Sequence, residues 1–163
     1  MERVDEEFEA LFSRYEEPIC SYLARMTGDL PRAQELAQET FLRAYRAMAR
    51  GETWENPRAW LYRVASRLAA NDHRRRKLLQ WVPLGDRDPA PGPSPAEATA
   101  ARLDFQAALN RLPPRYRAPL LLAAVADYRV AEIADILGLG SSAVKMRLSR
   151  AREMLRRAYD EGR

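Results

Sequence analysis

A proline-rich stretch near the middle of the chain sets the strongest limit on how the chain can fold. Residues 81–95, WVPLGDRDPAPGPSP, contain five prolines and two glycines. Proline removes a backbone donor and obstructs the preceding helical turn, and glycine adds backbone freedom, so regular structure does not continue through such a segment. The sequence therefore predicts two domains, residues 1–80 and 96–163, joined by a flexible linker over 81–95.

The segments on both sides of this linker have the apolar spacing of helices. Side chains recur every three or four residues through 5–27, where Pro18 is expected to interrupt or bend the helix. Pro31 and Gly51 mark the start and end of a second helix, and a third begins near Pro57. No stretch alternates as a strand does. The predicted fold is all-α, with two small helical domains.

The clearest local motif is VAEIADILGLGSSAVKMRLSRA, residues 130–151. Ala134 permits a close helix crossing, Gly138 permits a tight turn, and Val144 and Leu148 are expected to face inward. This pattern predicts a helix-turn-helix whose second helix enters a major groove, although an ordinary helical hairpin has similar spacing. The residues expected to face DNA are Ser141, Ser142, Lys145, Met146, Arg147, Ser149 and Arg150.

Charge is unevenly distributed along the chain. Residues 1–40 hold ten acids against four bases, and residues 41–80 hold three acids against ten bases. A second basic cluster runs from Lys145 to Arg157, with six bases and one acid. Two separate basic surfaces on a chain of pI ≈ 9.5 indicate a polyanionic partner, most simply nucleic acid.

The segment WLYRVASRLAANDHRRRK, residues 60–77, combines an apolar stripe with a basic one. At about 100° per residue, Arg63, Arg67 and Arg74 lie within a narrow arc opposite the apolar side chains. Asn71 and Lys77 flank this arc, and Trp60 lies at its edge. A solvated helix face and a phosphate-binding strip both fit this pattern.

The predicted helix over 31–50 carries two arcs. One arc is apolar and is expected to face the core; it consists of Ala33, Leu36, Ala37, Phe41, Ala44 and Met48. The other, formed by Gln38, Leu42, Tyr45 and Ala49, lies roughly opposite it. A central helix buried on two sides and a helix that presents a patch to a protein partner both fit this periodicity.

The composition argues against several classes of protein. Cys20 and His73 are the single cysteine and the single histidine, so we expect no internal disulfide and no zinc cluster built from Cys and His alone. We expect no other metal site and no cofactor. No glycine-rich phosphate loop or nucleophile elbow is present, so we do not expect an enzyme. No apolar run reaches about 18 residues, and the N-terminus lacks a signal-peptide core, which predicts a cytoplasmic protein without membrane insertion.

Three ordered blocks together carry a family resemblance. They are AQELAQETFLRAYRAM, NPRAWLYRVASRLAANDHRRRK and the segment from LPPRYRAPL through SRAREMLRRA. In this order, with a linker before the third block, the chain resembles the bacterial extracytoplasmic-function (group 4) RNA polymerase sigma factors. The resemblance covers nearly the whole chain. It implies a sigma factor that binds core RNA polymerase and directs promoter-specific transcription initiation.

The resemblance implies a role for each block. The first would dock on the clamp helices of the polymerase through Gln38, Glu39, Phe41, Leu42 and Tyr45. The second block and the preceding loop, RGETWEN, would capture and open the minus-ten element of promoter DNA through Trp54, Trp60, Tyr62, Arg63, Arg67, Asn71 and Arg74. The third would read the minus-thirty-five element. An anti-sigma factor is a further expected partner.

Two positions depart from the family pattern. The family usually has asparagine where this chain has Arg67 and aspartate where it has Asn71, so base readout by this helix is not carried over. The alternative is a stand-alone helix-turn-helix transcriptional regulator, for which the second domain alone would suffice. Such a regulator would need an effector pocket or a phosphoacceptor in its first domain, whereas this chain has the docking arc and the cationic strip.

Overall fold

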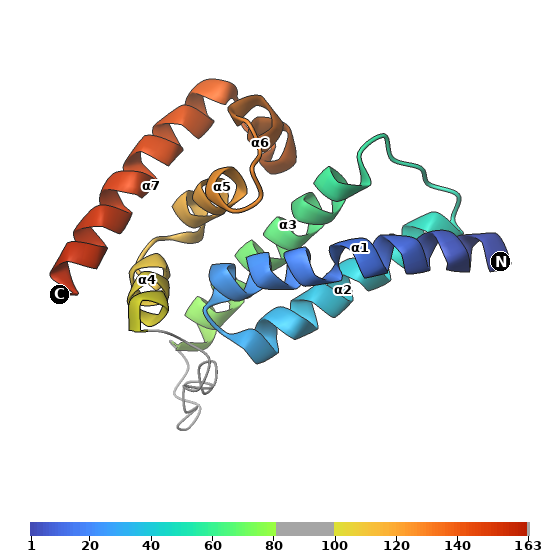
Figure 1. Cartoon of the computed structure of the whole chain (residues 1–163), viewed down its shortest axis with the longest axis horizontal. Helices are drawn as coiled ribbons and strands as arrows, with labels where there is room; N and C mark the ends of the chain where they lie inside the picture. The colour runs from blue at the N-terminus through green and yellow to red at the C-terminus, as the bar shows by residue number, and fades with distance from the viewer. Residues whose placement is uncertain (81–99, 163) are drawn as a thin grey trace.

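The computed structural model describes residues 1–80 and 100–162, and the expected linker over 81–95 lies outside the described residues. The described residues form seven helices and no strand, which confirms the all-α prediction (Figure 1). The helices are α1 Glu2–Thr27, α2 Leu30–Ala49, α3 Pro57–Gln80, α4 Ala100–Asn110, α5 Pro114–Ala124, α6 Val130–Leu137 and α7 Ser141–Glu161.

Helices α1, α2 and α3 form the first unit. A tight turn joins α1 to α2, because Gly28 adopts a left-handed conformation and Asp29 caps α2 by accepting a hydrogen bond from the Arg32 N–H at 3.1 Å. Pro31 lies in the first turn of α2, as the sequence predicts. Helix α1 continues through Pro18, so the expected interruption is absent there.

Helices α4 to α7 form the second unit. Helix α5 packs mainly along α7, and α6 crosses near the start of α7. The sequence Pro113–Pro114 ends the α4–α5 connection and starts α5, since proline is tolerated where the first helical N–H groups have no partner. The core of this unit is aliphatic and comprises Leu109, Leu112, Leu121, Leu122, Ile133, Val144 and Leu148.

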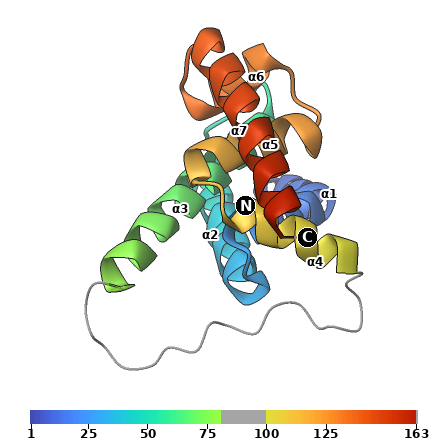
Figure 2. The same ribbon diagram turned by 90° about the vertical axis from the view of Figure 1, so that its left-hand side faces the viewer.

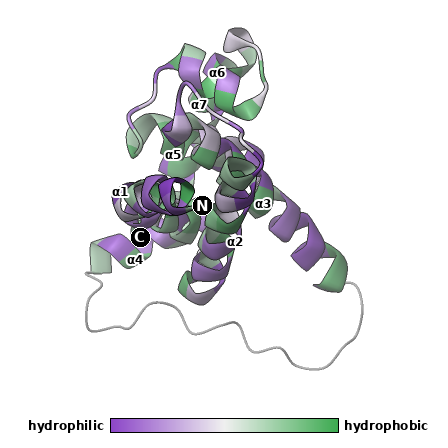
Figure 3. Cartoon of the chain, turned by 90° about the vertical axis from the view of Figure 1, so that its right-hand side faces the viewer, coloured by the Kyte–Doolittle hydropathy of each residue, from purple (hydrophilic) through white to green (hydrophobic). Residues whose placement is uncertain are grey.

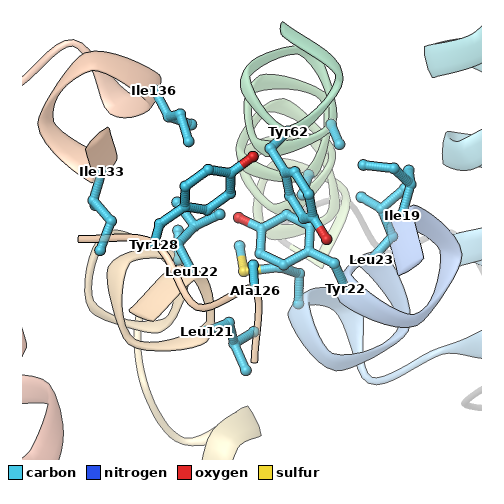
Figure 4. Packing of buried hydrophobic residues seen from close by; sticks show 14 of the residues in the cluster. Ile19, Tyr22, Leu23, Tyr62, Leu121, Leu122, Ala126, Tyr128, Ile133 and Ile136 are labelled. Carbon is cyan, nitrogen blue, oxygen red and sulfur yellow. The ribbon is translucent and has the colours of Figure 1, made fainter. Parts of the chain in front are cut away.

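The two units pack directly against each other and share one continuous apolar core. Helix α3 contacts α5 and α6, and α1 contacts α4 and α5 (Figure 2). Three tyrosine rings lie edge to face across this contact: Tyr22 to Tyr62 at 5.2 Å, and Tyr62 to Tyr128 at 5.6 Å (Figure 4). The Tyr22 and Ser66 hydroxyls are 2.7 Å apart, so the buried Tyr22 oxygen has a partner.

Arg117, on α5, makes a buried polar tie between the units. Its side chain is only 4% exposed, and it donates to the carbonyl of Met26 at the end of α1. It also donates to the carbonyls of Asn110 at 3.0 Å and Leu112 at 2.6 Å. Burial lowers the pKa of Arg117 to about 10, which still leaves it charged at neutral pH.

Arg58, at the start of α3, makes a second tie. Its Nη2 donates to the Ala126 carbonyl at 2.7 Å, and its guanidinium carbon lies 4.3 Å from the centre of the Tyr128 ring. Both contacts reach the loop that follows α5. The guanidinium therefore holds this loop against the first unit through a hydrogen bond and a cation–π contact.

Replacing Arg117 with methionine tests the first tie. Methionine retains much of the apolar stem but leaves the buried carbonyls of Met26 and Leu112 and the partly buried carbonyl of Asn110 without this donor, so the free energy of unfolding should fall by about 2–3 kcal/mol. Chemical denaturation measures this change. Arg115→Met, at an exposed neighbouring position, is the control and should change stability by less than about 0.5 kcal/mol. Equal effects of the two substitutions would contradict the role of Arg117.

Two glycines with matching backbone geometry test the contact between α1 and α4. Gly28 has φ +68°, and a Cβ there would lie 2.5 Å from Oδ1 of Asn110, whereas Gly138 has φ +67° and open space around it. Alanine at either position should cost about 1–2 kcal/mol for the left-handed backbone. Gly28→Ala should lower the thermal midpoint further than Gly138→Ala, because it also displaces Asn110. Equal shifts in the midpoint would mean that Asn110 and α4 move aside without a cost in stability.

Candidate nucleic-acid interface

Helices α6 and α7 form the predicted helix-turn-helix. Gly138 ends α6 in the left-handed conformation, with its N–H bonded to the Ala134 carbonyl. Val144 and Leu148 are buried, as their spacing predicts. Among the described residues no side chain caps the start of α7, so its first N–H groups can donate hydrogen bonds to an anion such as a backbone phosphate.

Most of the residues expected at DNA lie on the outer side of α7. Ser141, Ser142, Lys145, Met146, Ser149 and Arg150 are exposed. Arg147 is half-buried and faces the first unit instead. Arg150 lies near Tyr116, whose pKa it lowers by hydrogen bonding to the phenol. The sequence did not single out Tyr116, because a lone half-buried tyrosine carries no pattern.

Helix α3 presents the cationic strip formed by Arg63, Arg67 and Arg74, all of which are exposed. Asn71 lies on the same side and accepts a hydrogen bond from Arg74 at 3.0 Å. Arg63 donates to the Asp135 carbonyl of α6 at 2.8 Å, so one end of the strip touches the second unit. The C-terminal part of α3 is hydrophilic until its last turn (Figure 3).

Tyr62 does not belong to this exposed set. Its side chain is only 3% exposed and lies between Tyr22 and Tyr128, so in this arrangement it is not accessible for stacking on an unpaired base. Burial raises the pKa of Tyr62, and Arg58 partly opposes that shift. The resemblance suggested an aromatic contact here, but the side chain is part of the core.

Trp54 and Trp60 stack on each other. Their ring centres are 4.3 Å apart and the rings are tilted by 23°. Both are half-buried and line a hollow of about 530 Å³ with Tyr128, Glu132 and Asp135. Trp54 therefore packs on its neighbour and still keeps an accessible face.

The arc on α2 is partly available to a partner. Leu42 is 42% exposed and Gln38 is exposed, while Glu39 is half-buried and bonded to Arg43 at 2.9 Å. Tyr45 is half-buried, and its hydroxyl donates to Asp5 at 3.0 Å, which raises the pKa of the phenol.

Phe41 is a correction to the expected docking set. It is only 2% exposed and packs edge-on against Phe12 at 5.0 Å. The periodicity of α2 placed Phe41 in the core, and this prediction is confirmed. The role as a surface contact, which came from the resemblance, does not fit its burial.

A groove between the two units places the cationic strip of α3 opposite Arg115 and Arg147 of the second unit. It has a volume of about 740 Å³, and none of its described lining residues is a carboxylate. Its cationic lining consists of Arg63, Arg67, Arg74 and Lys77 from α3, Arg115 from α5 and Arg147 from α7. Sequence reasoning did not identify Arg115, because its place opposite α3 depends on how the units pack.

The described residues contain no group of three or more His, Cys, Asp or Glu side chains that could hold a metal ion. Cys20 is a half-buried free thiol whose pKa is raised by burial and by Glu16. Among the helices of the described segments, none is long and apolar enough to cross a membrane.

The two units match two known protein regions. Residues 11–78 match the family described as Sigma-70 region 2, and residues 102–155 match Sigma-70, region 4. The ECF RNA polymerase sigma factor SigG of Mycobacterium tuberculosis is 36% identical over 91% of this chain, which spans only 48% of that relative. SigL, also from Mycobacterium tuberculosis, is 33% identical, with 93% of this chain and 88% of the relative covered.

A solved structure shares the fold. The sigma factor RpoE of Bartonella quintana, solved in complex with the anti-sigma factor NepR, superposes with a TM-score of 0.77. The superposition covers 97% of this chain and 99% of that one at 22% sequence identity. At this identity the likeness establishes the arrangement of helices.

Proposed function

Because the chain belongs to the ECF RNA polymerase sigma factors, we propose that it binds core RNA polymerase and directs transcription initiation from specific promoters. The observation that carries this proposal is the pairing, in one chain, of a Sigma-70 region 2 unit with a helix-turn-helix that exposes a polar and cationic face. The family consists of initiation factors without catalysis of their own, so we assign the chain no reaction and no cofactor.

The proposed division of labour follows the two units, with residues 1–80 as the first domain and 96–163 as the second. The exposed part of the α2 arc, with Gln38 and Leu42 at its centre, would dock on polymerase. The cationic strip and the Trp54–Trp60 pair would hold the minus-ten element, since arginines bind phosphates and an indole face can stack on an unpaired base. The outer side of α7 would read the minus-thirty-five element.

In the structure the two units pack against each other, and we call this arrangement closed. The strip on α3 and Arg147 on α7 face the same groove. The groove has a volume of about 740 Å³, which suits a small molecule and is too small for a DNA duplex. We therefore expect the units to separate when the protein engages polymerase and promoter DNA. An anti-sigma factor, such as the one present in the RpoE complex, is the expected partner of the inactive protein. We expect the protein to act in the cytoplasm, both when it is bound to polymerase and when it is bound to an anti-sigma factor.

A stand-alone helix-turn-helix regulator remains the second candidate. The α2 arc weighs against it, since an exposed Leu42 beside polar neighbours on a Sigma-70 region 2 unit has no role in a regulator that never contacts polymerase. Transcription from a specific promoter by purified core polymerase and this protein separates the two candidates. Promoter binding without any transcript start would favour the regulator.

Two substitutions separate the proposed partners. Leu42→Arg places a charge in the docking arc and should weaken binding to core polymerase, while DNA binding by the free protein remains unchanged. Lys145→Ala should do the reverse and reduce the salt slope of DNA binding by about one. Ser13→Arg adds the same charge at an exposed position on α1 and is the control. A polymerase-binding defect in Ser13→Arg as large as that in Leu42→Arg would contradict the docking assignment.

Trp54→Ala distinguishes base capture from packing. Loss of stacking on an unpaired base, about 1–3 kcal/mol, should impair transcription from a fully paired promoter and spare a promoter with a pre-melted bubble. Loss of the 4.3 Å contact with Trp60 should instead lower the melting temperature of the protein and impair both templates equally. Measuring both templates beside the melting temperature decides between these roles.

A further inference from the structure

The groove between the units concentrates positive charge that nothing in the described structure neutralises. Six guanidinium or ammonium groups line it, and none of them forms an ion pair with a described carboxylate. Four come from α3, and the other two, Arg115 and Arg147, come from the opposite unit. Closure of the units therefore brings like charges together.

This convergence has an electrostatic cost that closure must overcome. Two like charges repel across several ångströms even near a protein surface, and the repulsion grows as water is excluded. His73, which also lines the groove, reports the same field: its pKa is lowered by burial first, and then by the charges of Arg117 and Lys77. An anion between the units would convert this repulsion into attraction.

We propose that the groove binds a small polyanion with two or more phosphate groups, which bridges α3 to Arg115 and Arg147 and stabilises the closed arrangement. Guanidinium groups suit this ligand because they form paired, charge-assisted hydrogen bonds with phosphate oxygens. The volume of about 740 Å³ lies within the usual range of small-molecule sites. The proposal goes beyond promoter binding.

Apolar side chains in the lining narrow the ligand class further. Met26, Ala118, Ile136, Leu137 and Leu139 line the groove together with the cations. These apolar side chains would contact the base of a nucleotide, whereas an inorganic phosphate chain would use the cations alone. A nucleoside triphosphate should therefore bind more tightly than inorganic triphosphate.

Competition with DNA follows if the proposed function is also correct. The cations of the strip would hold either the small polyanion in the closed form or promoter phosphates in the open form. This consequence rests on the proposed function, but binding of the small polyanion does not, because it is measured on the free protein. A failure of the polyanion proposal can therefore be distinguished from a failure of the proposed function.

The test is calorimetric titration of the full chain with inorganic triphosphate and, separately, with a nucleoside triphosphate. We expect one site per chain. Arg67→Gln/Arg147→Gln removes one groove cation from each unit and should weaken binding at least about tenfold, the effect expected for lost charge-assisted hydrogen bonds. Arg46→Gln/Arg156→Gln removes the same charge from exposed positions outside the groove and should leave the affinity within about twofold, as its long-range effect is screened by salt.

The single variants test the bridge itself. Arg67→Gln and Arg147→Gln should each weaken triphosphate binding, and triphosphate should raise the melting temperature of the wild-type chain but not that of the double variant. Unfolding of the variants is checked by their circular dichroism. No binding to the wild-type chain, equal weakening by the control pair, or an effect confined to Arg67→Gln would each overturn the proposal.

Discussion

The buried guanidinium of Arg117 is the interaction on which the arrangement of the two units depends. It lies where α1 ends and where α4 turns into α5, and it satisfies carbonyls from both units at once. A planar, five-donor group can do this from one position, whereas an ammonium group is a single point of charge. Among the ion pairs of the described residues none involves Arg117, so the carbonyls of Met26, Asn110 and Leu112 stabilise its charge.

The aromatic contacts fit around this tie. The cores of the two units are joined by the edge-to-face rings of Tyr22, Tyr62 and Tyr128. Arg58 lies over the ring of Tyr128. This packing turns the cationic side of α3 toward α7. Apolar and carbonyl contacts that favour the closed arrangement therefore act against the repulsion between the α3 cations and Arg115 and Arg147. A partner that carries phosphate groups, or one that binds to the units themselves, can shift that balance.

Much of the fold was predictable from local patterns. Pro31, Gly138 and the spacing of Val144 and Leu148 mark helix ends and a buried face, because capping and helical periodicity depend on residues only a few positions apart. The exposed side of α7 followed from the same reasoning. Predictions for single aromatic residues were weaker. The family resemblance placed Phe41 and Tyr62 at interfaces, and both are buried. An aromatic ring can pack in a core or against a partner, and sequence spacing does not distinguish the two.

By itself, the sequence determined the helices, the helix-turn-helix, the two basic clusters and the family, because each of these depends on local spacing, on charge or on the order of motifs along the chain. The tertiary structure alone decided that Arg117 reaches α1, that Arg115 and Arg147 face α3, and that Trp54 stacks on Trp60. The reason is physical: these contacts join residues far apart in the chain, and they depend on how two packed units are oriented, which no local periodicity encodes.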